Sequence, residues 1–543
     1  MTKLTLSVFD TTGIQDYIFG SNRLPENIGA SHLVEAATHE WVSQALKPPH
    51  NLDEAGQIVS APPLEKNQEQ QAEVIYRGGG NVVVLFRSLD VAKESTRRLS
   101  RLILEKAPGL KIAVAHKEFD CSKAIGGEEG VYNSLLAQLG SSKQQRQPSA
   151  PLLGQAVTLA CRATGLPAVG FDPNDSGRAL SAEVLAKVWR KDEANDRLYN
   201  FLPKEVTEKY ALSLDFDDLG RSKGESSYIA VVHADGNGIG NRFRHIANQY
   251  PNSKDNRIVL NALRALSMKI EEAGAKAVRQ TSLYLAASDL PEELQEFLDK
   301  LKREKKTEKP FLPFRPIVFG GDDVTFVCDG RLGLTLTVAY LQAFEEESKD
   351  LPGGPAFASA GMAVVKAHYP FGRAYALAED LCRNAKGRLA EEKLEGSALD
   401  WHFTQTGITE GLGQIRDREF CSADGKPLIM RPLTLKPHQQ DDWRQWGAFK
   451  AVIEKLTQPE WRERRNKVIA LRDALRAGPI ATRQFRLAYN LRELPHIGPE
   501  DKNTAEPYKT LREQGWSDGR CGYFDAIEAL DFYLPLLGTD KEG

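Results

Sequence analysis

The sequence predicts an α+β fold with two copies of a β-α-β-β-α-β unit, the element order of ferredoxin-like domains. Two pairs of matching segments support this fold class. The strand-like runs Leu4–Asp10 and Tyr228–Asp235 both end on Asp, and both have Gly-Ile at the third and fourth positions beyond it. Each copy then contains a β-rich hairpin with a Gly-led turn, Val74–Phe86 in the first copy and Pro316–Cys328 in the second. The shared order and the matching residues indicate an internal duplication.

Helices and a last strand complete each copy. Helical patterns separate the first strand from the hairpin, and a further helix and strand follow the hairpin. In the first copy these segments are Ala30–Leu46, Val91–Ala107 and the strand Lys111–His116. In the second copy they are Ile258–Ala277, Pro291–Lys305, Leu332–Ser348 and the strand Ser359–Lys366.

The duplication divides the chain into four predicted domains. A length of 543 residues predicts three or four domains at ~150 residues each. Residues 1–120 form the first copy and residues 224–426 the second. Residues 121–223 form a helical and loop-rich insert that includes the connector Ser141–Pro151, and residues 427–543 form a helical C-terminal domain.

Composition and charge exclude several classes of protein. The chain is 41% hydrophobic and 27% charged, which is typical of a globular protein. Its apolar runs are far shorter than the ~20 residues that span a bilayer, and no secretory pattern follows Met1, so we expect a cytoplasmic protein without a membrane segment. A net charge of -3 provides no overall attraction to nucleic acid. The six cysteines contain no C-x-x-C pair, so we expect neither zinc nor disulfides.

Three acidic residues are predicted to meet at one end of the second sheet. In the β-α-β-β-α-β order the third strand lies antiparallel beside the first, so the end of the first strand meets the hairpin turn. Asp235 therefore lies beside Asp322 and Asp323, with glycines that let a ligand approach the backbone. A Gly-Gly-Asp-Asp turn by itself is ordinary turn chemistry. A third acid at the adjoining strand end is not required by a turn, and it indicates a catalytic site.

Clustered carboxylates raise one another's pKa, and a hard divalent cation relieves their repulsion. Oxygen-only ligands suit Mg²⁺ or Mn²⁺. A pair of such ions activates an attacking hydroxyl group and neutralises a departing pyrophosphate. The sequence therefore predicts a metal-dependent phosphoryl-transfer site in the second copy.

These motifs resemble the second palm domain of the CRISPR-associated polymerase/cyclase large subunit of type III interference complexes, and more distantly the GGDEF cyclases. The likeness rests on Asp235–Gly240, read DGNGIG, and on Phe319–Val324, read FGGDDV. It continues in Ser359–Val364, in the helix Ala374–Glu392 and in the strand Ala398–Phe403. In the first copy, Ile14–Phe19 and Arg77–Gly80 resemble the first palm of the same family.

The resemblance implies an activity and a set of site residues. The family converts ATP into cyclic oligoadenylate second messengers that trigger antiviral effectors. By resemblance, the two metal ions and the catalysis belong to Asp235, Asp322 and Asp323. The nucleotide phosphates would lie against Gly236, Asn237, Gly320 and Gly321, and Lys386 would reach the triphosphate. For Lys386 the alternative is a solvated lysine on an amphipathic helix.

Two features of the family are missing from this sequence. None of the ten histidines is followed by Asp, so the nuclease-type HD motif is absent. Cys161, in the insert where the family carries a zinc element, has no C-x-x-C partner. We therefore expect a stand-alone or minimal cyclase without DNA cleavage.

Three functions stay open on the sequence. The first is a nucleotidyltransferase that uses ATP, or another NTP, to build a cyclic or linear oligonucleotide, with an activating protein or RNA as a further partner. The second is a nucleotide-binding scaffold or sensor of an RNA-guided or other defence complex, which holds ATP without turnover. The third, cyclic dinucleotide synthesis from GTP, rests on the GGDEF likeness alone. The oligomeric state, the base and the product size are open as well.

The two copies differ at the hairpin turn. Aligned hairpins place Gly80 against Asp322 and Asn81 against Asp323, whereas Asp10 still matches Asp235. One carboxylate is too little charge to assemble a metal pair, so we predict that the first copy is catalytically inactive. Its Gly-rich turn still leaves room for a nucleotide. For Asp10 the alternative is a helix-capping or turn role.

Overall fold

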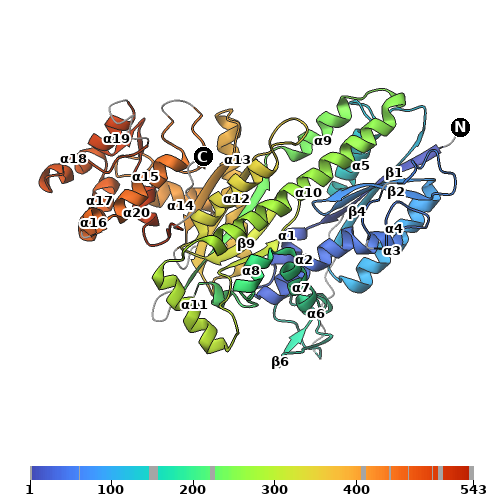
Figure 1. Cartoon of the computed structure of the whole chain (residues 1–543), viewed down its shortest axis with the longest axis horizontal. Helices are drawn as coiled ribbons and strands as arrows, with labels where there is room; N and C mark the ends of the chain where they lie inside the picture. The colour runs from blue at the N-terminus through green and yellow to red at the C-terminus, as the bar shows by residue number, and fades with distance from the viewer. Residues whose placement is uncertain are drawn as a thin grey trace.

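The computed structural model confirms the predicted α+β class and contains two main sheets (Figure 1). It describes residues 3–54, 56–59, 61–145, 157–220, 227–404, 411–438, 442–462, 464–491, 493–498 and 506–536. In Figure 1 the first copy lies on the right, the second copy in the middle and the C-terminal helices on the left. In the described part of the chain, no helix is long and apolar enough to cross a membrane.

The first sheet has the order β2-β3-β1-β4. Its strands are β1 (Lys3–Thr12), β2 (Ala72–Gly78), β3 (Asn81–Phe86) and β4 (Lys111–Asp120). The helices of this part are α1 (Ile14–Phe19), α2 (Leu24–Thr38), α3 (Glu40–Ala45), α4 (Leu89–Lys106) and α5 (Val131–Gln145). The strand runs alternate or are fully apolar, which buries one or both faces of the sheet.

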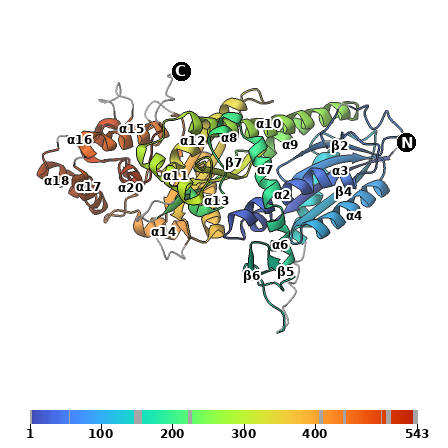
Figure 2. The same cartoon turned by 60° about the horizontal axis from the view of Figure 1, so that its bottom comes forward.

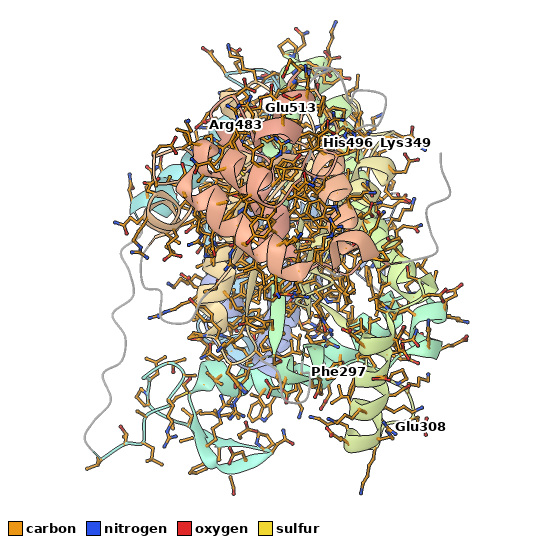
Figure 3. The ribbon with its side chains drawn as sticks, turned by 90° about the vertical axis from the view of Figure 1, so that its left-hand side faces the viewer. Phe297, Glu308, Lys349, Arg483, His496 and Glu513 are labelled. Atoms are coloured by element: carbon orange, nitrogen blue, oxygen red, sulfur yellow. The ribbon has the colours of Figure 1, made fainter. Side chains whose placement is uncertain are left out.

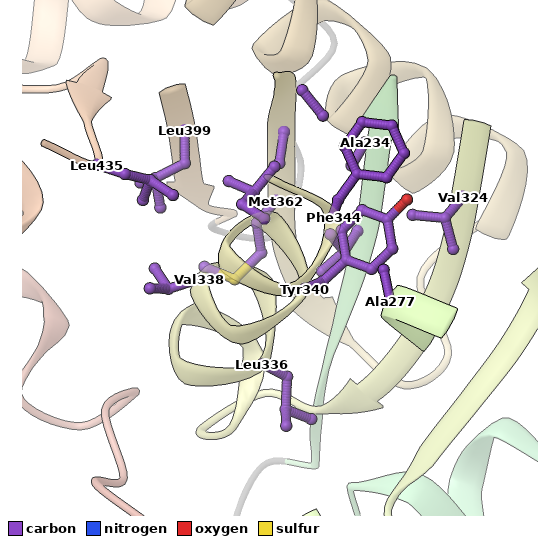
Figure 4. Close-up of a cluster of buried hydrophobic side chains, with 14 of the residues drawn as sticks. Ala234, Ala277, Val324, Leu336, Val338, Tyr340, Phe344, Met362, Leu399 and Leu435 are labelled. Carbon is purple, nitrogen blue, oxygen red and sulfur yellow. The ribbon is translucent and has the colours of Figure 1, made fainter. Parts of the chain in front are cut away.

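The second sheet repeats this order and extends it to β12-β11-β10-β7-β9-β8. Its strands are β7 (Tyr228–Gly236), β8 (Phe314–Val318), β9 (Asp323–Asp329), β10 (Ala358–Lys366), β11 (Ala398–Phe403) and β12 (Leu433–Thr434). Its helices are α9 (Ile239–Asn248), α10 (Asn256–Ala287), α11 (Glu292–Lys305), α12 (Gly333–Glu347), α13 (Phe371–Glu391) and α14 (Leu412–Glu419). One face is closed by α12, whose Tyr340 and Phe344 pack beside Met362 of β10 and Val324 of β9 (Figure 4).

The strand register confirms the alignment of the two hairpins. In the first sheet Asp10 lies directly opposite Asn81, and in the second sheet Asp235 lies directly opposite Asp323. A one-residue shift would have turned these side chains to the other face of each sheet. The acidic and amide residues therefore occupy equivalent positions in the two copies.

The long helix α10 joins the two copies. Within the second copy it packs against α12, and it also lies on β2 of the first sheet. Arg264 Nε donates to the carbonyl of Ile75 at 3.0 Å, and Ser267 Oγ donates to that of Arg77 at 2.9 Å. These bonds satisfy carbonyls at the edge of the first sheet and fix the orientation of one sheet relative to the other.

The insert contains a small hairpin and helices that dock on the first copy. The elements are β5 (Gly170–Asp172), β6 (Asp175–Leu180), α6 (Ala182–Trp189), α7 (Lys191–Phe201), α8 (Lys204–Lys209) and the 3₁₀ turn η1 (Phe216–Leu219). The hairpin projects from the lower side of the molecule (Figure 2). Helices α6 and α7 pack on α2, and Lys187 Nζ donates to the carbonyl of Tyr17 at 2.6 Å.

The four domain boundaries stay predictions, but two elements lie outside their predicted domains. Strand β12, within residues 427–543, pairs with β11 of the second sheet. Helix α5, which we assigned to the insert, packs against β4 and β1 of the first sheet. The predicted connector Ser141–Pro151 begins inside this helix, and its residues 146–151 lie outside the described residues. The apolar residues Val131, Leu135 and Leu139 recur at helical spacing and are buried, which explains why the helix docks on the sheet.

The C-terminal domain is helical with one added hairpin. It contains α15 (Trp446–Thr457), α16 (Pro459–Arg462), α17 (Arg465–Ala477), α18 (Pro479–Ala488), α19 (Tyr508–Gln514), β13 (Trp516–Ser517), β14 (Arg520–Cys521) and α20 (Phe524–Ala529). Seen from this end of the molecule, the helices with Arg483 and Glu513 lie well apart from the segment with Phe297 and Glu308 (Figure 3).

Candidate active site

The three acids lie close together at one end of the second sheet, as predicted. Asp235, near the end of β7, faces Asp323 at the start of β9. The backbone N–H of Gly236 donates to the carbonyl of Asp322 at 3.1 Å. A Cβ atom at Gly236 would lie 2.8 Å from the Cβ of Asp322, so a glycine is needed for the two chain segments to approach this closely.

The hairpin turn that carries Asp322 depends on its glycines. Gly320 and Gly321 have φ angles of 134° and 70°, which L side chains rarely adopt. Helix α10 supports the turn from behind, because a Cβ at Gly274 would lie 1.7 Å from the carbonyl oxygen of Gly321. The helix that joins the two copies therefore also sets the position of the acidic turn.

The carboxylates carry more negative charge than their surroundings compensate. Burial and the neighbouring charges of Asp235 and Asp323 raise the pKa of Asp322 to about 7. Burial and Asp235 raise the pKa of Asp323 to about 7 as well, although Lys386 lowers it in part. The buried Oδ1 of Asp323 has no hydrogen-bond partner among the described residues. The set is therefore short of positive charge.

Lys386 lies at the site and not on a solvated helix face. It projects from α13, and its Nζ donates to Asp235 Oδ2 at 2.5 Å and to the carbonyl of Gly236 at 3.1 Å. Its side chain is 30% exposed, so it can still reach a ligand. The alternative of a merely solvated lysine is wrong, whereas its contact with a triphosphate stays a prediction.

The side chain of Asn237 is used within the protein. Its Nδ2 donates to the carbonyl of Gly396 at 3.0 Å, and its Oδ1 accepts from Ser359 Oγ at 3.0 Å. These bonds tie the loop after β7 to the start of β11 and to β10. The predicted nucleotide contact of Asn237 is untested, and in this structure its side chain anchors the loop.

Asp235, Asp322 and Asp323 fit a hard divalent cation by their chemistry. All their ligand atoms are oxygens, and three carboxylates are balanced here by one ammonium group, that of Lys386. Across the described residues, no group of three or more His, Cys, Asp or Glu side chains is already arranged to hold a metal ion. In this structure Asp235 faces the ammonium group of Lys386 instead.

A cavity of about 510 Å³ lies between the two copies. The second copy contributes all three acids and the glycines of the acidic turn, and the first copy contributes its own Gly-rich turn, Gly78–Gly80, and Asn81. An adjoining cavity of about 440 Å³ is lined by residues 11–15 and Lys143 of the first copy and by Asp323. The acids therefore face the first copy across a space large enough for small ligands.

The first copy retains a reduced version of the site. Asp10 lies within β1 and forms an ion pair with Lys143 of α5. Burial raises the pKa of Asp10, and the hydrogen bond and charge of Lys143 lower it in part. Helix α1 has Gly13 as its N-cap residue, with no side-chain cap, so the capping role that we considered for Asp10 is wrong.

Lys143 is the counterpart of Lys386, and the sequence analysis missed it. Helix α5 follows the last strand of the first sheet as α13 follows β10, and each helix directs a lysine to the first-strand aspartate. The signal was a lysine in the helix after the last strand, the same pattern that identified Lys386. The predicted domain boundary at residue 120 hid it.

Other cavity residues, apart from Phe319 of the FGGDDV motif, had no sequence signal. The guanidinium group of Arg197 lies 4.6 Å from the ring centre of Phe319, and the hydroxyl groups of Tyr76 and Tyr132 are 2.9 Å apart. All four residues line the larger cavity. They come from the insert and from both copies, so only the folded chain brings them together.

Comparison with known proteins identifies solved structures with a similar fold. No family model matches the chain, and no curated protein matches it in sequence. The crystal structure of a Csm1-Csm4 cassette in complex with cA4 matches with a TM-score of 0.54 and 15% identity, covering 98% of this chain and 70% of the other. The apo Csm1-Csm4 cassette matches with a TM-score of 0.55, 14% identity and the same coverage.

Csm1 from T. onnurineus gives the same picture, with a TM-score of 0.50, 14% identity and coverage of 97% and 70%. A further match is the Csm1-Csm4 subcomplex of the type III-A CRISPR-Csm interference complex, with a TM-score of 0.53 and 15% identity. The resemblance to the type III large subunit, inferred from the motifs, is thereby confirmed at the level of the fold. The chain has the fold of Csm1.

Proposed function

We propose that this chain is a metal-dependent nucleotidyltransferase that joins ATP into a cyclic or linear oligoadenylate. The observation that carries the proposal is a single cavity lined by Asp235, Asp322 and Asp323 on one side and by the open turn Gly78–Gly80 on the other. The similar Csm1-Csm4 cassettes were crystallised with cA4, with pppApA and with AMPPNP, which supports ATP as the substrate.

The residues of the second copy would bind the reacting triphosphate. Mg²⁺ or Mn²⁺ held by the three carboxylates would supply the positive charge that favours attack on a phosphate and departure of pyrophosphate. Gly320 and Gly321 line the cavity, and their backbone would lie against the phosphates. Lys386 would leave Asp235 and bind the triphosphate. The triphosphate carries more negative charge than a carboxylate whose charge is partly neutralised by a metal ion, so it attracts the ammonium group more strongly.

The first copy would hold the second nucleotide. In the reaction the ribose hydroxyl of one nucleotide attacks the α-phosphate of the other, a new O–P bond forms, and pyrophosphate leaves. The turn Gly78–Gly80 and Lys143 line the side of the cavities opposite the acids. Orientation of two bound reactants in one cavity is itself a large source of rate enhancement.

The experiment is incubation of the protein with each NTP and with Mg²⁺ or Mn²⁺, followed by detection of pyrophosphate and by the mass of the product. ATP is expected to give pyrophosphate and an oligoadenylate. A GTP-derived cyclic dinucleotide would favour the GGDEF-like alternative. Absence of product with every NTP, in the presence of candidate activating RNAs or proteins, would contradict the proposal.

The rival proposal is a nucleotide-binding scaffold in a defence complex. The ion pair between Lys386 and Asp235 favours it, since a carboxylate engaged by lysine has to be released before it can bind metal. Tight ATP binding without turnover, or co-purification with a guide RNA, would support this function. An antiviral role for either function rests on the likeness of the fold to Csm1.

A further inference from the structure

One oxygen of Asp323 is directed away from the cavity and toward a histidine. The buried Oδ1 lies 3.4 Å from Nδ1 of His233, while the side chain of Asp323 as a whole is 40% exposed. The exposure therefore belongs to the other carboxylate oxygen, on the cavity side. His233 is 4% exposed and lies on β7 two residues before Asp235, so both point to the same face of the sheet.

The imidazole of His233 lies beside two polar groups of β9, the hydroxyl group of Thr325 and the carboxylate of Asp323. Nδ1 also lies 3.4 Å from Thr325 Oγ1, directly across the sheet on β9. The ring is buried, and an imidazole with its proton on Nδ1 is a hydrogen-bond donor at that atom. This donor lies within reach of the Oδ1 of Asp323, which accepts no hydrogen bond from the described residues.

Aromatic rings hold His233 in place and lead to the first copy. The ring of Tyr375, on α13, meets the imidazole edge to face, with centres 5.4 Å apart. On its other side Tyr375 stacks on Phe19 of α1, with ring centres 3.8 Å apart and planes within 23°. Helix α1 follows directly on Gly13, in the loop that lines the smaller cavity.

The contact between α1 and α13 is fixed by the backbone as well. The N–H of Phe371 donates to Asn22 Oδ1 at 2.8 Å. A Cβ at Gly372 would lie 2.9 Å from the carbonyl oxygen of Phe19, so the two backbones touch. The first copy therefore provides a rigid support for Tyr375, and Tyr375 in turn supports His233.

We propose that His233 is a positioning residue that orients the carboxylate of Asp323 toward the cavity, and that the first copy keeps His233 in place through Phe19 and Tyr375. The proposal deepens the proposed function, on which it rests, because the orientation of a metal-binding carboxylate matters for metal-dependent transfer. Hydrogen-bond partners of metal ligands commonly change metal affinity or activity by 10–100-fold when they are removed.

The first test is Mn²⁺ binding to the full chain, followed by electron paramagnetic resonance. His233→Phe keeps an aromatic ring but removes the donor, and it should weaken Mn²⁺ binding at least about tenfold. His233→Gln, which restores an N–H donor, should recover part of the affinity. The KM for ATP at saturating Mn²⁺ should change by less than about twofold, since the histidine does not contact the nucleotide. His245→Phe, on the exposed side of α9, is the matched control.

The second test breaks the support from the first copy. Phe19→Leu removes the ring that stacks on Tyr375 and should weaken Mn²⁺ binding by about two- to tenfold. Phe216→Leu is the matched control, because Phe216 stacks on Phe371 at the same junction, with ring centres 4.5 Å apart. It should leave Mn²⁺ binding unchanged.

Each outcome decides the proposal. Wild-type Mn²⁺ affinity in His233→Phe, or equal effects of Phe19→Leu and Phe216→Leu, would overturn it. If His233→Phe fails to fold, the Phe19 and Phe216 pair decides alone. If the wild-type protein binds Mn²⁺ but turns over no NTP, the proposed function fails while the positioning role is still measured. Absence of Mn²⁺ binding by the wild-type protein would overturn both.

Discussion

Each copy has a sheet with the same strand order and register and a lysine in the same place, yet only the second copy has an acidic turn. Asp10 and Asp235 each lie on the first strand and each pair with a lysine from the helix after the last strand. Opposite them, the first copy has Gly80 and Asn81, and the second has Asp322 and Asp323. The comparison teaches that the fold positions the site, while two side chains decide whether it has the charge to hold a metal ion.

The largest effect should come from removing the acids of the second copy. Asp322→Ala combined with Asp323→Ala should lower pyrophosphate release by more than about 100-fold, because the charge that stabilises the transition state is lost. Asp10→Ala should lower it only in part, without loss of metal from the second copy. The measurement is steady-state pyrophosphate release under one set of conditions. A folded Asp10→Ala variant as inactive as the double variant would refute the assignment of chemistry to the second copy alone.

The second prediction compares the effects of Lys386 and Lys143 on nucleotide binding. If Lys386 meets the triphosphate, Lys386→Ala should weaken NTP binding by ~1.5–3 kcal/mol, the range for hydrogen bonds to charged groups. Lys143→Ala should weaken binding of a second nucleotide and spare the first. Calorimetric titration with a non-hydrolysable ATP analogue separates the two sites. Unchanged affinity in Lys386→Ala would remove this lysine from the nucleotide site.

The third prediction is that the acidic turn cannot simply be restored in the first copy. Gly80 has a φ of 79°, and a Cβ there would lie 2.5 Å from Ile14 Cδ1 and 2.7 Å from Thr11 Oγ1. Gly80→Asp should therefore destabilise the protein by about 1–3 kcal/mol, from backbone strain and overpacking. Gly79→Asp, where a Cβ would have nothing within 4 Å, is the control that separates backbone strain from overpacking. The two melting temperatures, read in the same buffer, check this, and an unaffected Gly80→Asp variant would contradict it.

The last prediction concerns stability and pH. A carboxyl group with a pKa of 3.8 in the unfolded chain and about 7 in the folded chain keeps its proton to a higher pH in the folded state. Metal-free stability should therefore fall as pH rises from about 4 to about 7. Asp322→Asn and Asp323→Asn should flatten this fall and raise the melting temperature at neutral pH in EDTA. Added Mg²⁺ should reverse the order, because it favours the carboxylates. Identical pH profiles for wild type and variants would contradict the raised pKa values.

The sequence by itself determined the element order, the duplication and the meeting of Asp235 with Asp322 and Asp323. These predictions rest on local patterns: strand and helix periodicity, Gly-led turns, and a topology in which the third strand pairs with the first. The alignment of the two hairpins followed as well, from the matching Gly-led turns and the strand runs beside them. The motifs also led to the Csm1 fold.

Only the tertiary structure decided which distant groups complete the site. Lys143 joined Asp10 because α5 packs on the first sheet, beyond the boundary that we predicted at residue 120. The side chain of Asn237 forms hydrogen bonds within the protein because the fold brings Gly396 and Ser359 beside it. The support of His233 by Tyr375 and Phe19 depends on two helices more than 350 residues apart. Such contacts carry no local periodicity, because packing between copies sets them, and packing depends on the shape of surfaces that exist only after each copy has folded.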